Sequence, residues 1–177
     1  MKAFLLNHFD SIVTIFITIL GFVITYFMTK KNFRDEIQKD KIALASQEIQ
    51  TLPYDICQLM DGMIKNGAKK QDAFVKEYGA ILSKVLAYGS KDAVKVAVKM
   101  QQMSYDAARE GKSDHNRLLA AYSLLITQLK YDLTSEVISP ESWFQLRITD
   151  YTPIQSEMKN QINSIVDEIE LSKSFKV

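Results

Sequence analysis

The feature that most constrains this sequence is an uninterrupted apolar segment near its amino end. Residues 12–28 read IVTIFITILGFVITYFM, seventeen residues without a charged side chain. With Ser11 and Thr29 added, the segment forms a helix of roughly 28 Å, which nearly matches the ~30 Å hydrocarbon core of a bilayer. The threonines and the single Gly21 inside it are tolerated in a membrane helix. The segment therefore predicts a transmembrane helix.

Two other interpretations of the apolar segment stay open at this point. A helix buried in the core of a soluble protein is one; the membrane helix is favoured over it because the segment is apolar on every face and opens the chain. A cleaved signal peptide is the other. It calls for a small-x-small cleavage site after Met28, where Thr29, Lys30 and Lys31 stand instead. We expect an uncleaved anchor, with residues 1–29 forming a short extracytoplasmic tail and the membrane helix.

The basic residues that flank the apolar segment predict its orientation. Only Lys2 precedes the segment, whereas five basic residues follow it closely: Lys30, Lys31, Arg34, Lys39 and Lys41. Lysine and arginine accumulate on the cytoplasmic side of a membrane helix. We expect the amino terminus outside, Lys30, Lys31 and Arg34 at the membrane surface, and the rest of the chain in the cytosol. The predicted location is the inner (plasma) membrane, with the lipid bilayer as a partner.

The remainder of the chain is predicted to be helical. Hydrophobic residues make up 47% of the sequence, enough apolar surface to offset the entropy of an ordered chain. Six glycines and three prolines leave few breaks, and no useful stretch alternates with period two. Residues 30–41 are polar nearly all round and predict a helical stalk. Residues 42–177 predict a cytosolic bundle of about five or six helices, so the fold class is all-α.

Capping residues predict where several of these helices begin and end. Pro53 ends or kinks the helix that leaves the membrane. Ser90 suits the N-cap of a helix that runs to Glu110, with Gly111 closing it. Ser113 is predicted to cap a helix over residues 114–133, which is apolar on most faces and is the candidate central helix.

Two dipeptides, each a serine or threonine followed by proline, predict the starts of the last two helices. Ser139 followed by Pro140 is a typical helix start, and this segment is predicted to run to Ile148. The pair at 152–153 repeats the pattern and predicts a final helix that runs to about Ser172.

Few residues in this sequence suit catalysis or metal binding. Cys57 is the only cysteine, and the two histidines, His8 and His115, have no spacing typical of a metal site or a catalytic relay. The net charge of +1 argues against a nucleic-acid binder. The carboxylates, Glu141 and Glu168 among them, are expected at the surface. We therefore predict no catalytic residue, no cofactor and no metal.

Two groups of residues are candidates for binding a partner. Lys91, Lys95 and Lys99 lie one per helical turn; a solvated helix face is the ordinary interpretation, and a docking surface for an acidic partner or anionic lipid is the alternative. Trp143 and Phe144 stand in a short segment. They are either a lid on the core or a hot spot of an interface.

Two stretches of the chain resemble segments of small bacterial or phage proteins that join an amino-terminal membrane helix to a helical domain. They are AYGSKDAVKVAVKMQQ at 87–102 and the stretch at 118–151, in which LKYDL at 129–133 is the most recognisable piece. The resemblance covers under a third of the chain. It implies a bacterial origin and carries no assigned activity.

These observations predict a membrane-tethered, non-enzymatic module that binds a protein partner or itself at the inner face of a bacterial membrane. The alternative is a defence or superinfection-exclusion effector of a mobile element, which would perturb the membrane. An enzyme with an unrecognised helical active site is the third possibility.

Overall fold

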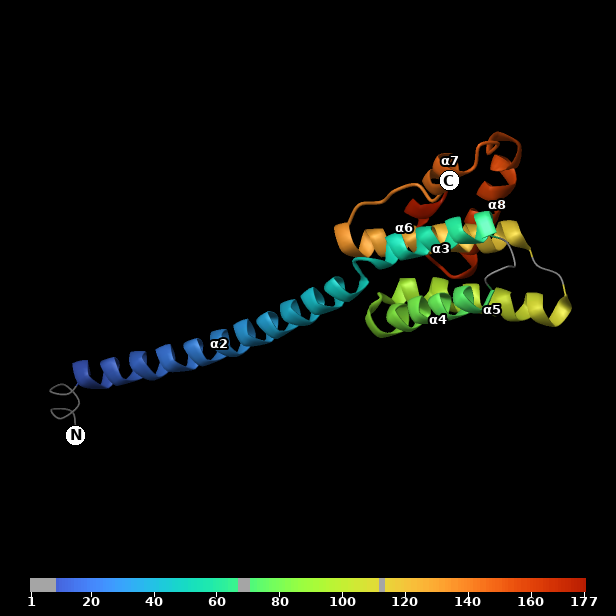
Figure 1. Ribbon diagram of the computed structural model, residues 1–177. Coiled ribbons are helices and arrows are strands. Elements are labelled where there is room, and N and C mark those ends of the chain that lie inside the picture. The colour runs from blue at the N-terminus through green and yellow to red at the C-terminus, as the bar shows by residue number, and fades with distance from the viewer. Residues whose placement is uncertain (1–8, 67–70, 112–113) are drawn as a thin grey trace. The chain divides into compact units, whose positions relative to one another are not determined.

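The computed structural model describes residues 9–66, 71–111 and 114–177, and every regular element in these ranges is a helix (Figure 1). The α-helices are α2 (Phe9–Ile49), α3 (Leu52–Asn66), α4 (Gln71–Tyr88), α5 (Lys91–Glu110), α6 (His115–Thr134), α7 (Glu141–Arg147) and α8 (Gln155–Glu168). Two short 3₁₀ turns, η2 (Thr152–Ile154) and η3 (Lys173–Phe175), flank α8. The predicted all-α class is confirmed for the described residues.

Helix α2 is long and apolar enough to cross a membrane, judged by its length and composition. Its most apolar window of 18 residues has a mean hydropathy of 1.8, and none of that window is buried. The helix continues without interruption to Ile49 (Figure 1). Lys30, Lys31 and Arg34 are exposed on it. No glycine or proline follows Gly21 within α2, which is why the polar residues simply extend the apolar helix.

Contacts divide the chain into two compact units, Met1–Leu44 and Ala45–Val177. Helices α3 to α8 belong to the second unit, which contains the hydrophobic core. The break between α2 and α3 lies just before Pro53, which occupies the first turn of α3. Proline is tolerated there because a first-turn N–H has no partner within the helix.

Helix α5 begins and ends at the residues that its capping pattern predicts. The Ser90 hydroxyl accepts a hydrogen bond from the Ala93 N–H at 3.1 Å, and Gly111 closes the helix in the left-handed region at φ 64°. Glycine adopts that conformation without steric cost.

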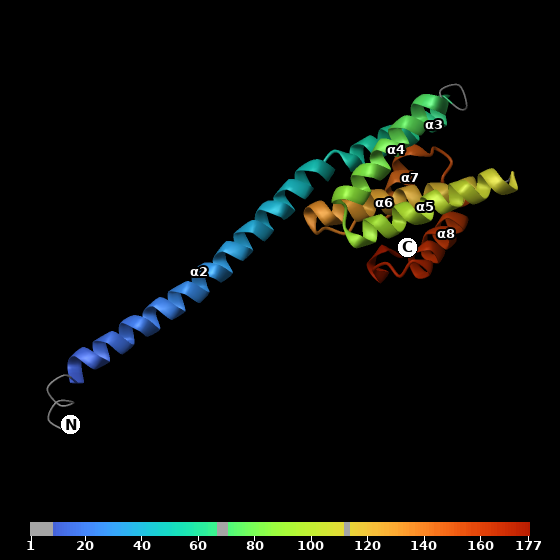
Figure 2. The ribbon, with the colours of Figure 1, turned by 90° about the horizontal axis from the view of Figure 1, so that it is seen from below.

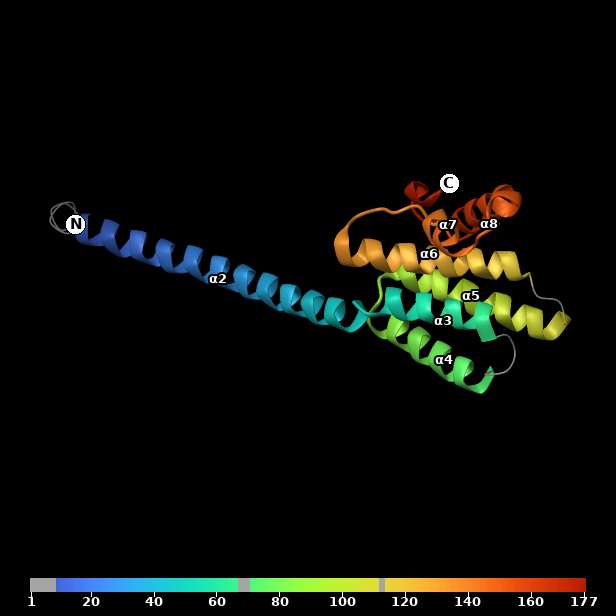
Figure 3. The same ribbon diagram turned by 45° about the horizontal axis from the view of Figure 1, so that its top comes forward.

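Helix α6 is the central helix of the second unit. Every residue from Ala120 to Leu129 is buried, and α6 packs against α3, α5 and α8. Figure 3 shows α3 and α5 on one side of α6 and α7 and α8 on the other, and Figure 2 shows α5 and α6 running side by side. The Asp114 carboxylate caps the start of α6 and accepts the Arg117 N–H at 3.0 Å, whereas the predicted cap, Ser113, lies outside the described residues.

Helix α8 ends at Glu168, earlier than the sequence predicts. Glu170 takes the left-handed conformation at φ 54°, and the Leu171 N–H turns back to donate to the Val166 carbonyl at 3.0 Å. This arrangement is a Schellman motif, which usually has glycine at the left-handed position. Leu171 is buried next to Glu170, so apolar packing stabilises this turn although it contains no glycine.

Candidate functional site

The three lysines of α5 do not form one cationic stripe. A helix turns about 100° per residue, so each step of four residues moves about 40° round the axis. Lys91 is exposed, Lys95 pairs with Asp92 at 2.8 Å, and Lys99 turns toward α8 and pairs with Glu168 at 2.7 Å. Only the first lysine is therefore presented to solvent without an ion pair among the described residues.

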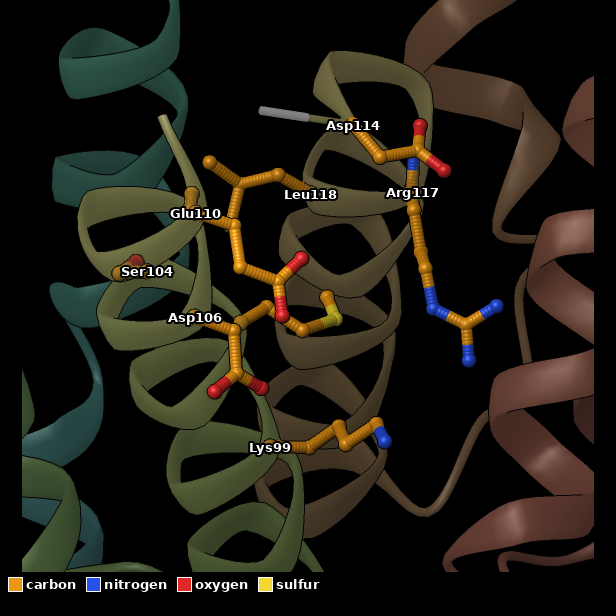
Figure 4. Close-up of a pocket in the computed structure, with 9 residues that line it drawn as sticks. Lys99, Ser104, Asp106, Glu110, Asp114, Arg117 and Leu118 are labelled. Atoms are coloured by element: carbon orange, nitrogen blue, oxygen red, sulfur yellow. The ribbon is translucent and has the colours of Figure 1, made fainter. Parts of the chain in front are cut away.

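Lys99 instead lines a groove between the second half of α5 and the start of α6 (Figure 4). The groove has a volume of about 450 Å³. Its apolar lining residues are Met103, Ala107 and Leu118. Figure 4 shows the carboxylates of Asp106 and Glu110 on the α5 side, opposite the Lys99 amine and the Arg117 guanidinium. The groove thus has an acidic side and a basic side, and a third lining carboxylate, that of Asp114, lies beside Arg117 on the basic side.

A single carboxylate, that of Glu168, joins the basic side of the groove to α8. One of its oxygens accepts from the Arg117 guanidinium and from the Ser164 hydroxyl, and the other pairs with Lys99. Arg117 also donates to the side-chain amide oxygen of Gln161 at 3.1 Å. Helices α5, α6 and α8 therefore meet at one charge cluster, which we call the Glu168 cluster (Lys99, Arg117, Glu168).

The Glu168 cluster lowers the pKa of its carboxyl group to about 2. The hydrogen bond from Lys99 is the largest cause; partial burial acts in the opposite direction, and the bonds from Arg117 and Ser164 add to the lowering. Hydrogen bonds and cations beside a carboxylate favour its charged form. The cluster therefore holds Glu168 ionised well below neutral pH.

The substitution Glu168→Gln is expected to lower stability at pH 7 by about 1 kcal/mol, a modest value because the side chain is partly exposed. The folded pKa lies below the ordinary 4.5, so this stabilisation is present above about pH 4.5 and is lost as the pH falls toward 2. Thermal unfolding of the full-length protein in detergent micelles, followed by circular dichroism at pH 7 and pH 2.5, measures the effect. The control is Glu110→Gln, on the opposite side of the groove. An equal loss at both pH values for Glu168→Gln would contradict the assignment.

Trp143 and Phe144 lie in the core. Their exposed fractions are 7% and 0%, the two rings meet edge to face, and Tyr151 stacks on Phe144 with ring centroids 5.8 Å apart. The Trp143 indole N–H is buried without a hydrogen-bond partner among the described residues. A partner could reach these two side chains only if α7 left its place.

Glu141 was expected at the surface, and this expectation was wrong, because only 6% of the residue is exposed. Its carboxylate accepts from the Tyr151 hydroxyl at 2.9 Å and the Gln155 amide at 3.0 Å, and it pairs with Lys159 at 3.2 Å. Burial raises the pKa of the Glu141 carboxyl, but these hydrogen bonds outweigh burial and the net pKa lies below the usual value. The partners follow ten or more residues later in the chain, so local sequence offers no signal for this site.

The described residues contain no group of three or more His, Cys, Asp or Glu side chains that could hold a metal ion. In the groove, the Ser104 hydroxyl donates to the Met100 carbonyl of its own helix at 3.1 Å. Cys57 is half-buried, and burial, with Asp61 beside it, raises the pKa of its thiol. A raised pKa keeps a thiol protonated and weakly nucleophilic.

Comparison of the chain with protein-family models, with curated proteins and with solved structures found no match.

Proposed function

We propose that this chain is a membrane-tethered, non-enzymatic helical protein that binds a protein partner at the inner face of a bacterial membrane. The observation that carries the proposal is the wholly exposed apolar window of α2. Soluble monomers rarely expose contiguous apolar patches larger than a few hundred Å². A bilayer covers such a helix on every side, which no single protein groove does.

Two features of the second unit support a role in binding. The α5–α6 groove places apolar, acidic and basic side chains together at the surface. Several large apolar side chains are also exposed, among them Leu146 at 81%, Leu86 at 72% and Tyr105 at 66%. Exposed apolar residues next to charged ones are typical of interfaces that form and dissociate.

The proposal is tested by chemical cross-linking in living bacterial cells, followed by capture of the full-length protein. The comparison protein carries an unrelated apolar helix in place of residues 12–28. A tethered adaptor is expected to capture the same stoichiometric partner in both forms, because recognition lies outside the anchor. Capture of nothing by either form would contradict the proposal. Depolarisation of the membrane that depends on the native anchor would favour the membrane-perturbing effector instead.

A further inference from the structure

Helix α4 uses only one of its faces within the second unit. It packs on α3 and α5, with Ile81 and Val85 buried and the Tyr78 ring 6.1 Å from that of Tyr122. The opposite face is exposed, and no described residue of the second unit covers it. We call it the α4 outer face; it comprises Val75, Lys76, Gly79, Ala80, Ser83, Leu86 and Ala87.

The α4 outer face suits close contact with another helix. Val75 and Leu86 are 58% and 72% exposed, so the face carries large apolar side chains that nothing in this unit covers. Small residues lie between them, and the backbone at Gly79 has open space where a side chain would stand. Small side chains let two helix axes approach to the short end of the usual 8–10 Å range.

Residues on the two edges of the α4 outer face are arranged symmetrically about the middle of the helix. At about 100° per residue, Val75 and Leu86 fall on one edge of the face, and Glu77 and Lys84 fall on the other. The midpoint of the apolar pair and the midpoint of the charged pair coincide, between Ala80 and Ile81. Glu77 and Lys84 are both exposed, and neither forms an ion pair with another described residue.

This register matches a second copy of the same helix in the antiparallel direction. A two-fold interface pairs residue i with j and j with i. About the shared midpoint, Val75 of each copy meets Leu86 of the other, and Glu77 of each meets Lys84 of the other. A parallel arrangement would instead set Glu77 beside Glu77 and Lys84 beside Lys84, and like charges repel.

We propose that the α4 outer face is the surface through which two copies of this chain associate, as an antiparallel, two-fold symmetric pair of α4 helices. One helix face is smaller than the roughly 800 Å² per partner of a stable interface, so two free copies associate weakly. Confinement to a membrane raises the effective concentration of one copy around another. The inference therefore rests on the proposed membrane tethering, which supplies this higher effective concentration. Lys76, at the end of the face, extends its stem along the other copy and keeps its amine in water.

Charge exchange in the full-length protein, reconstituted in lipid vesicles, tests the pairing. Glu77→Lys and Lys84→Glu are each expected to weaken self-association about tenfold, because each turns two attractive contacts into repulsive ones. The double variant is expected to restore it. A mixture of the two single variants is expected to form the mixed dimer, since one copy is then basic and the other acidic at both positions. Energy transfer between labelled copies measures the dimer fraction.

Matched controls place the same charge changes elsewhere. Asp150→Lys and Lys173→Glu are exposed positions outside α4 and are expected to leave association unchanged. Unaltered association of both α4 single variants, or failure of the mixture to associate, would overturn the antiparallel pairing. If the control variants weakened self-association as much as the α4 variants do, the cause would be a general effect of charge, and this result would also overturn the antiparallel pairing.

Single cysteines in a Cys57→Ser background test the register independently. Ala80→Cys lies beside the two-fold axis and is expected to form a disulfide-linked dimer on mild oxidation. Ala87→Cys lies about 20 Å along the axis from its symmetry mate and is expected not to. Equal yields at the two positions would overturn the register.

Flotation of the vesicles is measured on every sample. A protein that does not float with lipid contradicts the proposed tethering. A protein that floats but stays monomeric, or that binds only an unrelated partner, contradicts the α4 interface alone.

Discussion

Replacement of both Ile19 and Phe22 by arginine is expected to remove most of the full-length protein from the membrane fraction. The two residues lie near the middle of the apolar segment, and their side chains are 57% and 74% exposed. A central arginine costs about 2.5–3.5 kcal/mol on insertion scales, so the pair costs roughly 5–7 kcal/mol. The measurement is the share of protein that sediments with membranes after an alkaline carbonate wash.

Ile19→Leu with Phe22→Leu is the matched control, because it changes the same two positions and keeps them apolar. This control is expected to sediment with membranes like the parent protein. If the double arginine variant stayed in the washed membranes at the level of the control, α2 would not be the anchor.

Phe144→Ala is expected to produce the largest loss of stability among single substitutions in α7, about 3–5 kcal/mol. The ring is fully buried, meets Trp143 edge to face and stacks on Tyr151, so its removal leaves a cavity bordered by two aromatic side chains. Loss of helical circular dichroism on heating, in detergent micelles, measures the change. The helical signal of α2 is expected to persist, since the substitution touches only the second unit.

Leu146→Ala, two residues further along the same helix, provides the comparison. Leu146 is 81% exposed, so this change is expected to shift stability by no more than about 0.5 kcal/mol. Together the two variants separate the two roles predicted for the aromatic pair. If the Phe144→Ala protein unfolded at the same temperature as the parent protein but no longer bound a partner, this result would favour the hot-spot role over the lid.

Helix boundaries in this chain could be predicted where a local residue determines them. Ser90 and Gly111 act through their own side chain or backbone conformation, and both lie where the pattern predicts. The start of α3 likewise follows from Pro53. The end of α8 could not be predicted in this way, because Glu170 is held in the left-handed region by the burial of its neighbour Leu171.

The charged sites depend on contacts between residues far apart in the chain. Glu168 meets Arg117 and Lys99 because α8 packs on α6 beside α5. Helical spacing alone grouped Lys99 with Lys91 and Lys95, although the drift of about 40° per step already separates it from the first lysine. The lysine spacing therefore predicted the helix correctly, but it did not predict that the Lys99 side chain turns toward α8.

The position of α6 has a consequence during synthesis of the chain. Its packing against α3 joins two helices that are made at different times, since α6 is completed roughly 70 residues after α3. At about 5–20 residues per second, the ribosome delivers those residues in about 4 to 14 s. Until then Leu52, Ile56 and Met60, all of which end up buried, have no completed α6 to cover them. The nascent chain thus exposes the apolar segment of α2 and the apolar face of α3 before α6 is complete, and a chaperone that shields α3 during this interval would prevent aggregation.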